Sequence, residues 1–159
     1  MDIHIASASA EGLTLLAAFD AALLKLGVGD HNLVHLSSVI PLKSRVVRKK
    51  LRLNGKYQGD RIYCVFAENR TNCVGHTVAA GLGWVMTKNN PKWGLFVEHT
   101  GHTKQEVEIQ IKESLETMTK NRPAYEWGRV QSEIVETKCV DYPVCAMALA
   151  AYQRVDWYA

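Results

Sequence analysis

Two carboxylates in this 159-residue sequence stand among apolar residues, where a carboxylate could bind a cation or transfer a proton. The first is Asp20, in the run A-A-F-D-A-A-L-L, which has no Lys or Arg three or four positions away. Burial of an unpaired carboxylate costs free energy and favours its neutral form. We therefore expect Asp20 either to meet a cation, from a ligand or from a distant part of the chain, or to face a gap filled by solvent.

Glu98 is the second carboxylate, in the run G-L-F-V-E-H. Alternation along a strand places Glu98 on the same face as Phe96, with Leu95 and Val97 on the opposite face. An apolar neighbour favours the protonated form of a glutamate, which suits a general acid. The alternative is a carboxylate at the end of a strand, in water beside His99.

Metal and nucleotide chemistry have weak support in the sequence. His99 and His102 form an H-x-x-H pair without a helical frame or a third ligand, so we expect no metal site. A Gly-rich phosphate loop, a G-x-S-x-G elbow and an H-E-x-x-H motif are all missing from the sequence. The commonest motifs of nucleotide-binding and hydrolytic enzymes are therefore excluded.

The composition is that of a soluble globular chain, with 47% hydrophobic and 22% charged residues, and it predicts a single domain over residues 1–159. The apolar run from Cys145 to Ala151 is far shorter than the roughly 18 residues of a membrane span. Met1-Asp2 does not open a signal peptide, so a cytoplasmic location with no membrane partner is expected. The four cysteines form no C-x-x-C pair, which indicates reduced and mostly buried thiols.

Positive charge is concentrated between Lys43 and Lys56, a segment that contains seven Lys and Arg residues and no acid. Such a cluster could bind nucleic acid or another polyanion. Its alternation with Val46, Val47 and Leu51 also suits an exposed edge strand whose charges discourage aggregation. We favour the solvated edge, because no nucleic-acid-binding motif accompanies the cluster.

The secondary-structure pattern predicts strands interrupted by a few helices. Helices are expected from Thr14 to Leu26, ending at Gly27, and after the capping pattern Thr103-Lys104-Gln105-Glu106. A weaker helical pattern covers Thr71 to Ala80, and Val144 to Tyr152 fits either a helix or, slightly better, a buried strand. The other expected strands are Ile3–Ser7, Asn32–Leu36, Arg61–Ala67, Leu82–Met86, Gly94–His99 and Val130–Thr137. These elements indicate a layered α/β or α+β sandwich with helices covering the sheets.

A longer motif runs through residues 11–41, E-G-x(7)-D-x-A-L-L-x-x-G-x-G-x-x-N-L-x-x-x-S-S-x-x-P. It strongly resembles the pyruvoyl-dependent arginine decarboxylases. The resemblance continues more thinly through Gly94–Glu98, the helix after Thr103, Ser132–Thr137 and Cys145–Tyr152. It is poorest in the segment from Leu42 to Thr71, which bears more on the range of substrates than on the type of reaction. The matching positions are Glu11, Gly12, Asp20, Ala22, Leu23, Leu24, Gly27, Gly29, Asn32, Leu33, Ser37, Ser38 and Pro41.

The resemblance implies an α+β, four-layer α/β/β/α sandwich that cuts its own chain between Ser37 and Ser38. Ser38 Oγ would attack the Ser37 carbonyl, and the resulting ester would eliminate and hydrolyse to a pyruvoyl group with loss of ammonia. The products would be a small chain of residues 1–37 and a large chain of residues 38–159. The proenzyme must strain or polarise that peptide bond, and Asn32 is the expected hydrogen-bonding helper.

By the same resemblance, the pyruvoyl group would form a Schiff base with arginine and release agmatine and CO₂, without pyridoxal phosphate or a metal. Glu98 would protonate the substrate α-carbon, and Asp20 would bind the guanidinium through two parallel hydrogen bonds. Leu16 and Gly29 would complete the substrate pocket. The resemblance also implies a homotrimer with active sites at subunit boundaries, in a step that feeds polyamine synthesis or acid resistance.

Two alternatives remain at the level of the sequence. The same chemistry could act on ornithine, lysine or histidine. An uncleaved homologue could instead serve as a binding or regulatory subunit, with the segment from Lys43 to Lys56 on an acidic partner or RNA. Retention of Ser37, Ser38 and both carboxylates argues against this second alternative.

Overall fold

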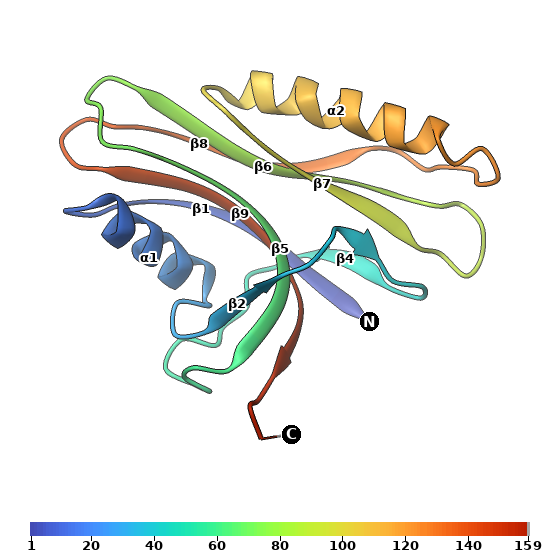
Figure 1. Cartoon of the computed structure of the whole chain (residues 1–159), viewed down its shortest axis with the longest axis horizontal. Helices are drawn as coiled ribbons and strands as arrows, with labels where there is room; N and C mark the ends of the chain where they lie inside the picture. Colours follow the sequence, from blue (N-terminus) through green and yellow to red (C-terminus); the bar gives the residue numbers. More distant parts are fainter. Residues whose placement is uncertain (159) are drawn as a thin grey trace.

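Two β-sheets pack face to face, and one helix covers the outer face of each sheet, in a computed structural model that describes residues 1–158 (Figure 1). The five-stranded sheet has the spatial order β2 (Asn32–His35), β5 (Arg61–Thr71), β9 (Val144–Val155), β1 (Asp2–Glu11) and β4 (Arg45–Arg48). The four-stranded sheet has the order β3 (Val39–Ile40), β7 (Gly94–Gly101), β6 (Thr77–Met86) and β8 (Gln131–Lys138). Helix α1 (Leu15–Leu26) contacts β1, β5 and β9, and helix α2 (Lys104–Lys120) contacts β6, β7 and β8. The expected α/β/β/α sandwich is confirmed, and Ala159 lies outside the described residues.

Helix α1 begins and ends where its capping residues predict. The Thr14 side chain accepts a hydrogen bond from the Ala17 amide at 3.0 Å, and Gly27 closes the helix with a φ of 85°. Gly27 is also required by space, because a Cβ there would come within 1.8 Å of the Leu51 carbonyl oxygen. The helix buries Ala18, Ala22, Leu23 and Leu26 against the five-stranded sheet. Small residues on this face let the helix lie close to the strands.

Helix α2 follows the second expected pattern. Thr103 caps it by accepting a hydrogen bond from the Glu106 amide at 3.2 Å. Its apolar stripe, Val107, Ile111 and Leu115, is fully buried against the four-stranded sheet. The facing strand makes room for this stripe with glycine, since a Cβ on Gly83 would come within 2.1 Å of the Ile111 side chain.

The two central strands, β9 and β6, are buried on both faces. Residues 144–152 form most of β9, which confirms the preference for a strand there. The weak helix expected over Thr71–Ala80 is wrong, because Thr71 ends β5, residues 72–76 form a turn and β6 begins at Thr77. A strand covered on both sides carries a continuous apolar run, so its sequence has no alternation to distinguish it from a helix.

The remaining expected strands are confirmed, and most are a few residues longer than expected. The short strand β3 was not predicted, and β4 falls within the basic segment for which an edge strand was expected. β4 forms one edge of the five-stranded sheet, parallel to β1, and Arg45 pairs with Asp2 at 2.7 Å. Part of the basic segment therefore lies on an edge strand, as its alternation indicates.

The apolar core lies between the two sheets and under each helix. Aromatic residues Trp84 and Phe96 fill the space between the sheets, with ring centroids 6.1 Å apart. Cys64, Cys139 and Cys145 are buried as free thiols and Cys73 is exposed. Burial raises the pKa of both Cys64 and Cys145 to about 12. Among residues 1–158, no helix combines the length and the hydropathy needed to cross a membrane.

The stripe of α2 provides a direct test of this packing. Replacement of the buried Ile111 by alanine leaves a cavity between α2 and β6, and should lower the free energy of unfolding by about 2–5 kcal/mol. Ile109, on the same helix, is 49% exposed, so Ile109→Ala should change it by no more than about 0.5 kcal/mol. Urea unfolding of both variants measures the difference, and equal losses would contradict the placement of α2.

Candidate active site

Ser38 lies between β2 and β3 in a backbone conformation that serine rarely adopts. Its φ is 63°, in the left-handed region where a residue with a Cβ is strained by about 1–3 kcal/mol. The Ser38 carbonyl accepts a hydrogen bond from the Phe96 amide at 2.8 Å, and the Val39 carbonyl accepts one from the Tyr152 hydroxyl at 3.2 Å. Contacts from β7 and β9 therefore hold the strained segment from both sheets.

Glu98 is the direct partner of Ser38. The Ser38 hydroxyl donates a short hydrogen bond to Glu98 Oε1, across 60 positions of sequence. The Glu98 side chain is 27% exposed and shares its strand face with the fully buried Phe96, as the alternation of β7 predicts. A carboxylate in this position can take the hydroxyl proton and make the serine oxygen a nucleophile. The structure thus brings together Ser38 and Glu98, two residues expected in one site.

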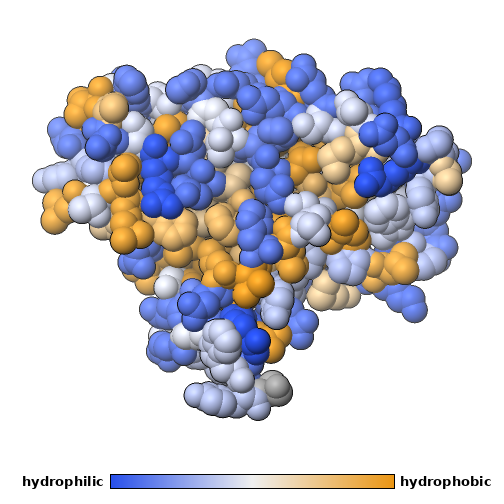
Figure 2. All heavy atoms as spheres, viewed as in Figure 1, coloured by the Kyte–Doolittle hydropathy of each residue, from blue (hydrophilic) through white to orange (hydrophobic). Residues whose placement is uncertain are grey.

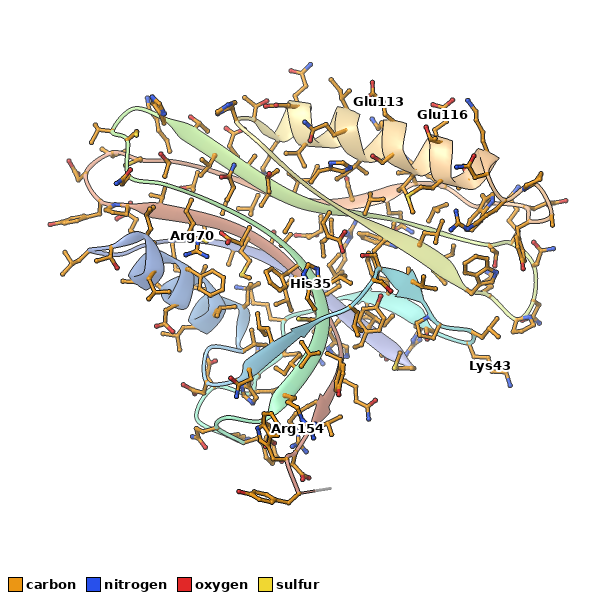
Figure 3. The ribbon with its side chains drawn as sticks, in the orientation of Figure 1. His35, Lys43, Arg70, Glu113, Glu116 and Arg154 are labelled. Carbon is orange, nitrogen blue, oxygen red and sulfur yellow. The ribbon has the colours of Figure 1, made fainter. Side chains whose placement is uncertain are left out.

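His35 is a third member of this cluster and was not predicted from the sequence. Its Nε2 atom lies 3.7 Å from Glu98 Oε1, and its ring stacks on Phe66 with centroids 4.6 Å apart. Figure 3 shows His35 near the centre of the molecule, where β2 runs beside β5. The only signal in the sequence was its position three residues before Ser38.

Tyr152 is a fourth member, also missed, because it ends an alanine-rich run that shows no functional pattern. Burial raises the pKa of Tyr152, and the nearby Glu98 charge acts in the same direction. The phenol therefore keeps its proton at neutral pH and remains a donor to the Val39 carbonyl.

Of the three residues assigned to substrate binding, Leu16 and Asp20 lie on the outer surface of α1 and Gly29 follows the helix. Asp20 is exposed, and it has no ion pair in the part of the chain that the structure describes, so of the two expected alternatives the single chain shows the solvent-facing carboxylate. Leu16, one turn before it, is 68% exposed, and Gly29 packs against the Leu24 side chain at the end of the helix. Hydrophobic side chains are visible over α1 in Figure 2, in line with the exposure of Leu13, Leu15, Leu16 and Leu24. Within residues 1–158, no hydrogen bond or ion pair joins this surface to Ser38 and Glu98.

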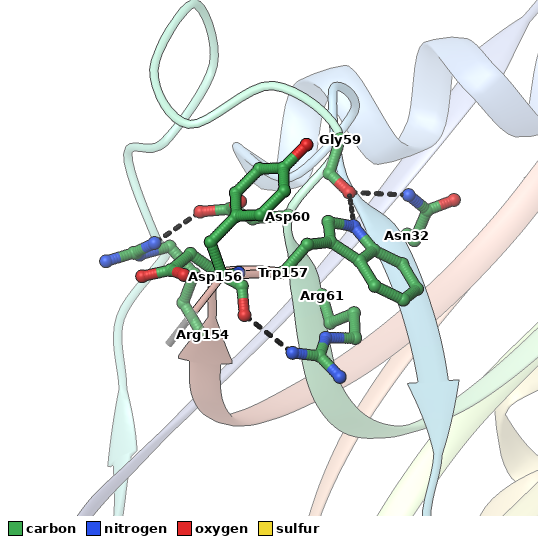
Figure 4. A network of polar contacts seen from close by, with 8 residues as sticks. Asn32, Gly59, Asp60, Arg61, Arg154, Asp156 and Trp157 are labelled. Carbon is green, nitrogen blue, oxygen red and sulfur yellow. Dashed lines mark hydrogen bonds and ion pairs between the residues drawn. The ribbon is translucent and has the colours of Figure 1, made fainter.

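The side chain of Asn32 is bonded elsewhere than at the Ser37–Ser38 peptide, where it was expected to help cleavage. Its side-chain amide donates to the Gly59 carbonyl at 2.6 Å, and the same oxygen accepts from Trp157 Nε1 at 2.7 Å (Figure 4). No hydrogen bond in the described part of the chain links Asn32 to Ser37 or Ser38. In this arrangement Asn32 ties β2 to the loop before β5.

The two histidines of the H-x-x-H pair, His99 and His102, have separate partners. His99 Nε2 lies 2.8 Å from Ser114 Oγ on α2, while His102 is exposed and its backbone amide bonds to Glu106. Burial lowers the pKa of His99, which favours its neutral form.

Comparison with known proteins places these observations in a family. The family model described as pyruvoyl-dependent arginine decarboxylase matches residues 2–156. The chain belongs to the pyruvoyl-dependent arginine decarboxylase family. The resemblance seen in residues 11–41 therefore extends over nearly the whole chain.

Individual members of the pyruvoyl-dependent arginine decarboxylase family are similar along most of their length. A protein of that name from Thermococcus kodakarensis is 38% identical over 146 residues, which cover 91% of this chain and 90% of the relative. Another from Methanocaldococcus jannaschii is 30% identical over 158 residues, covering 98% and 89%. Among solved structures, a pyruvoyl-dependent histidine decarboxylase matches with a TM-score of 0.43 at 14% identity, over 59% of this chain and 51% of the other.

The raised pKa of Tyr152 gives a pH-dependent prediction. Above pH 10, the ordinary pKa of tyrosine, the Tyr152 phenol ionises in the unfolded chain but keeps its proton in the folded chain. Its contribution to the free energy of unfolding is therefore complete below pH 10 and is lost as the pH rises above 10. Between pH 10 and 11 the free energy of unfolding of the protein with the wild-type side chain should fall by about 1 kcal/mol more than that of Tyr152→Phe. Urea unfolding of both proteins, each carrying Ser38→Ala to keep the chain in one piece, measures the two slopes. Parallel slopes would show that Tyr152 ionises freely in the fold.

Proposed function

We propose that this chain is a self-cleaving, pyruvoyl-dependent decarboxylase that converts L-arginine to agmatine and CO₂. The observation that carries the proposal is the hydrogen bond from the Ser38 hydroxyl to Glu98, made by a serine in a strained conformation. Family membership supports it, since the similar proteins are named pyruvoyl-dependent arginine decarboxylases.

Cleavage would begin with the proton that Ser38 shares with Glu98. As Glu98 accepts this proton, Ser38 Oγ attacks the Ser37 carbonyl carbon, the peptide C–N bond breaks, and the Ser38 nitrogen takes up the proton as a free amine. Loss of the Ser38 α-proton then expels the Ser37 carboxylate, and hydrolysis releases ammonia. The products are residues 1–37 and residues 38–159, the second beginning with a pyruvoyl group.

The hydrogen bonds around Ser38 are suited to hold a pyruvoyl group that forms at this residue. Hydrogen bonds from Phe96 and Tyr152 fix the carbonyls of Ser38 and Val39, so the new terminus would stay beside Glu98 after cleavage. When formed, the pyruvoyl ketone supplies an electrophile for the substrate amine and an acceptor for the electrons released with CO₂. Neither pyridoxal phosphate nor a metal is required for this step. Glu98 then supplies the proton that replaces the carboxyl group on the α-carbon.

Substrate recognition would use the outer surface of α1. A guanidinium offers two parallel donors to one carboxylate, which suits the exposed Asp20, and Leu16 and Gly29 would border the aliphatic part of arginine. This surface does not meet Ser38 within one chain, so a neighbouring subunit would bring Asp20 to it. A homotrimer would cover the exposed leucines of α1 and place the sites at subunit boundaries.

Cleavage has a simple genetic test. Ser38→Ala removes the attacking hydroxyl and should leave one uncleaved chain on a denaturing gel. Ser37→Ala is the matched control, because residue 37 contributes only its carbonyl group, and this variant should still yield two chains. Cleavage of the Ser38→Ala protein at the same peptide bond would exclude Ser38 as the nucleophile.

Glu98→Gln tests the base. Glutamine fills the same space but cannot accept the hydroxyl proton, so the rate of chain cleavage should fall by about 100-fold or more. The rate is followed by mass spectrometry on freshly synthesised protein. A cleavage rate equal to that of the wild type would remove Glu98 from the maturation step.

Asp20→Asn tests substrate recognition. Loss of the charged hydrogen bonds should raise the KM for arginine by roughly 10- to 100-fold while cleavage remains normal. An unchanged KM for arginine would contradict a role in binding the guanidinium, and a profile against ornithine, lysine and histidine would identify a different substrate.

Mixing the two variants tests the subunit boundary. In randomly mixed trimers of Asp20→Asn and Glu98→Gln chains, about one quarter of the sites would combine an intact Asp20 with an intact Glu98 from different subunits. Activity should therefore return in the mixture, measured as CO₂ release from arginine. If each site were formed by a single chain, mixing would restore nothing.

A further inference from the structure

Glu98 must regain a proton after each turnover of the proposed reaction. Decarboxylation breaks the bond from the α-carbon to the carboxyl group and consumes one proton for each CO₂ released. Glu98, which would deliver this proton, is 27% exposed and must be reprotonated before the next turnover. A basic group that lies beside this carboxylate and is itself more exposed to solvent can supply the proton.

We propose that His35 is a positioning and proton-relay residue that reloads Glu98 from solvent, an inference that rests on the proposed function. Its imidazolium would give the Nε2 proton to the Glu98 carboxylate and then regain one proton from water. Each cycle takes one proton from solvent and places one on the α-carbon, so the balance closes.

Geometry favours His35 for this role. Its side chain is 51% exposed, so the ring reaches both solvent and the carboxylate, whose Oε1 lies 3.7 Å from Nε2. Stacking on Phe66 holds the ring in a fixed plane. Within residues 1–158, His35 supplies the only basic nitrogen within 4 Å of Glu98.

The other groups around Glu98 do not fit the role. Tyr152 is buried, keeps its proton and donates to the Val39 carbonyl. His99, the next residue of β7, has its Nε2 atom 2.8 Å from Ser114 of α2. Ser38 occupies Glu98 Oε1 in the uncleaved chain, but maturation would consume its hydroxyl. The same oxygen would then be left with His35.

Two variants separate proton relay from packing. His35→Ala opens space beside Phe66, whereas His35→Phe keeps a stacked ring that cannot carry a proton. Both should still cleave into two chains and should lose about tenfold or more in kcat for arginine, with little change in KM. Added imidazole should restore kcat in His35→Ala, in proportion to its concentration, and should not affect His35→Phe. His76→Phe, in the exposed turn before β6, is the control and should behave as the wild type.

A wild-type kcat in His35→Phe would overturn the proposal, because stacking alone would then suffice. Failure of imidazole to restore His35→Ala would overturn it as well. Failure of the proposed function would look different, since the wild type itself would then not cleave or not decarboxylate arginine.

A readout without turnover uses the uncleaved Ser38→Ala protein. The ¹³C shift of the Glu98 carboxyl carbon is followed with pH in this protein and in Ser38→Ala/His35→Phe. The two curves should differ, because only the first protein carries an ionisable ring beside Glu98. Identical titration curves for the two proteins would show that His35 and Glu98 are not coupled.

Discussion

The hydrogen bond between Ser38 and Glu98 is the contact on which the candidate site depends, and the fold is what makes it possible. Ser38 leaves the five-stranded sheet after β2, and Glu98 belongs to β7 of the four-stranded sheet. The strained backbone at Ser38 persists because β7 and β9 each fix a neighbouring carbonyl group. The two-sheet sandwich therefore stabilises the strained conformation of Ser38, because a strand of each sheet holds its segment by a hydrogen bond.

The two helices differ in the kind of side chain that they expose on their outer surfaces. Helix α2 is amphipathic, with its apolar stripe buried and its charged side chains in solvent. Helix α1 buries small residues inward but also presents Leu16 and Leu24 outward, on the side that carries Asp20. Leucines exposed around one carboxylate form an apolar surface that is costly in an isolated chain, and such a surface fits the subunit boundary proposed above.

Local patterns in the sequence were sufficient for much of the fold. Capping residues Thr14, Gly27 and Thr103 fixed the helix boundaries, and alternation placed Glu98 on the face of Phe96. The pattern failed at Thr71–Ala80, where β6 is buried on both faces and carries no alternation. Residues of the site were predictable only where a motif marked them. Strand pairing and the approach of the two sheets bring His35 to Glu98 and Tyr152 to the Val39 carbonyl, and neither contact is encoded in local spacing. For Asp20 the apolar neighbours left burial and exposure equally open, and only the structure shows that the helix turns this face outward.

The central claim is that the chain cuts itself at Ser38 and converts the new terminus into a pyruvoyl group. An intact-mass spectrum of the purified wild-type protein under denaturing conditions tests it most directly. The account predicts two chains that separate between Ser37 and Ser38, the larger one lighter than a chain that begins with serine by the difference between serine and pyruvoyl. A single mass for the whole chain, or a larger fragment that begins with an unmodified serine, would contradict it.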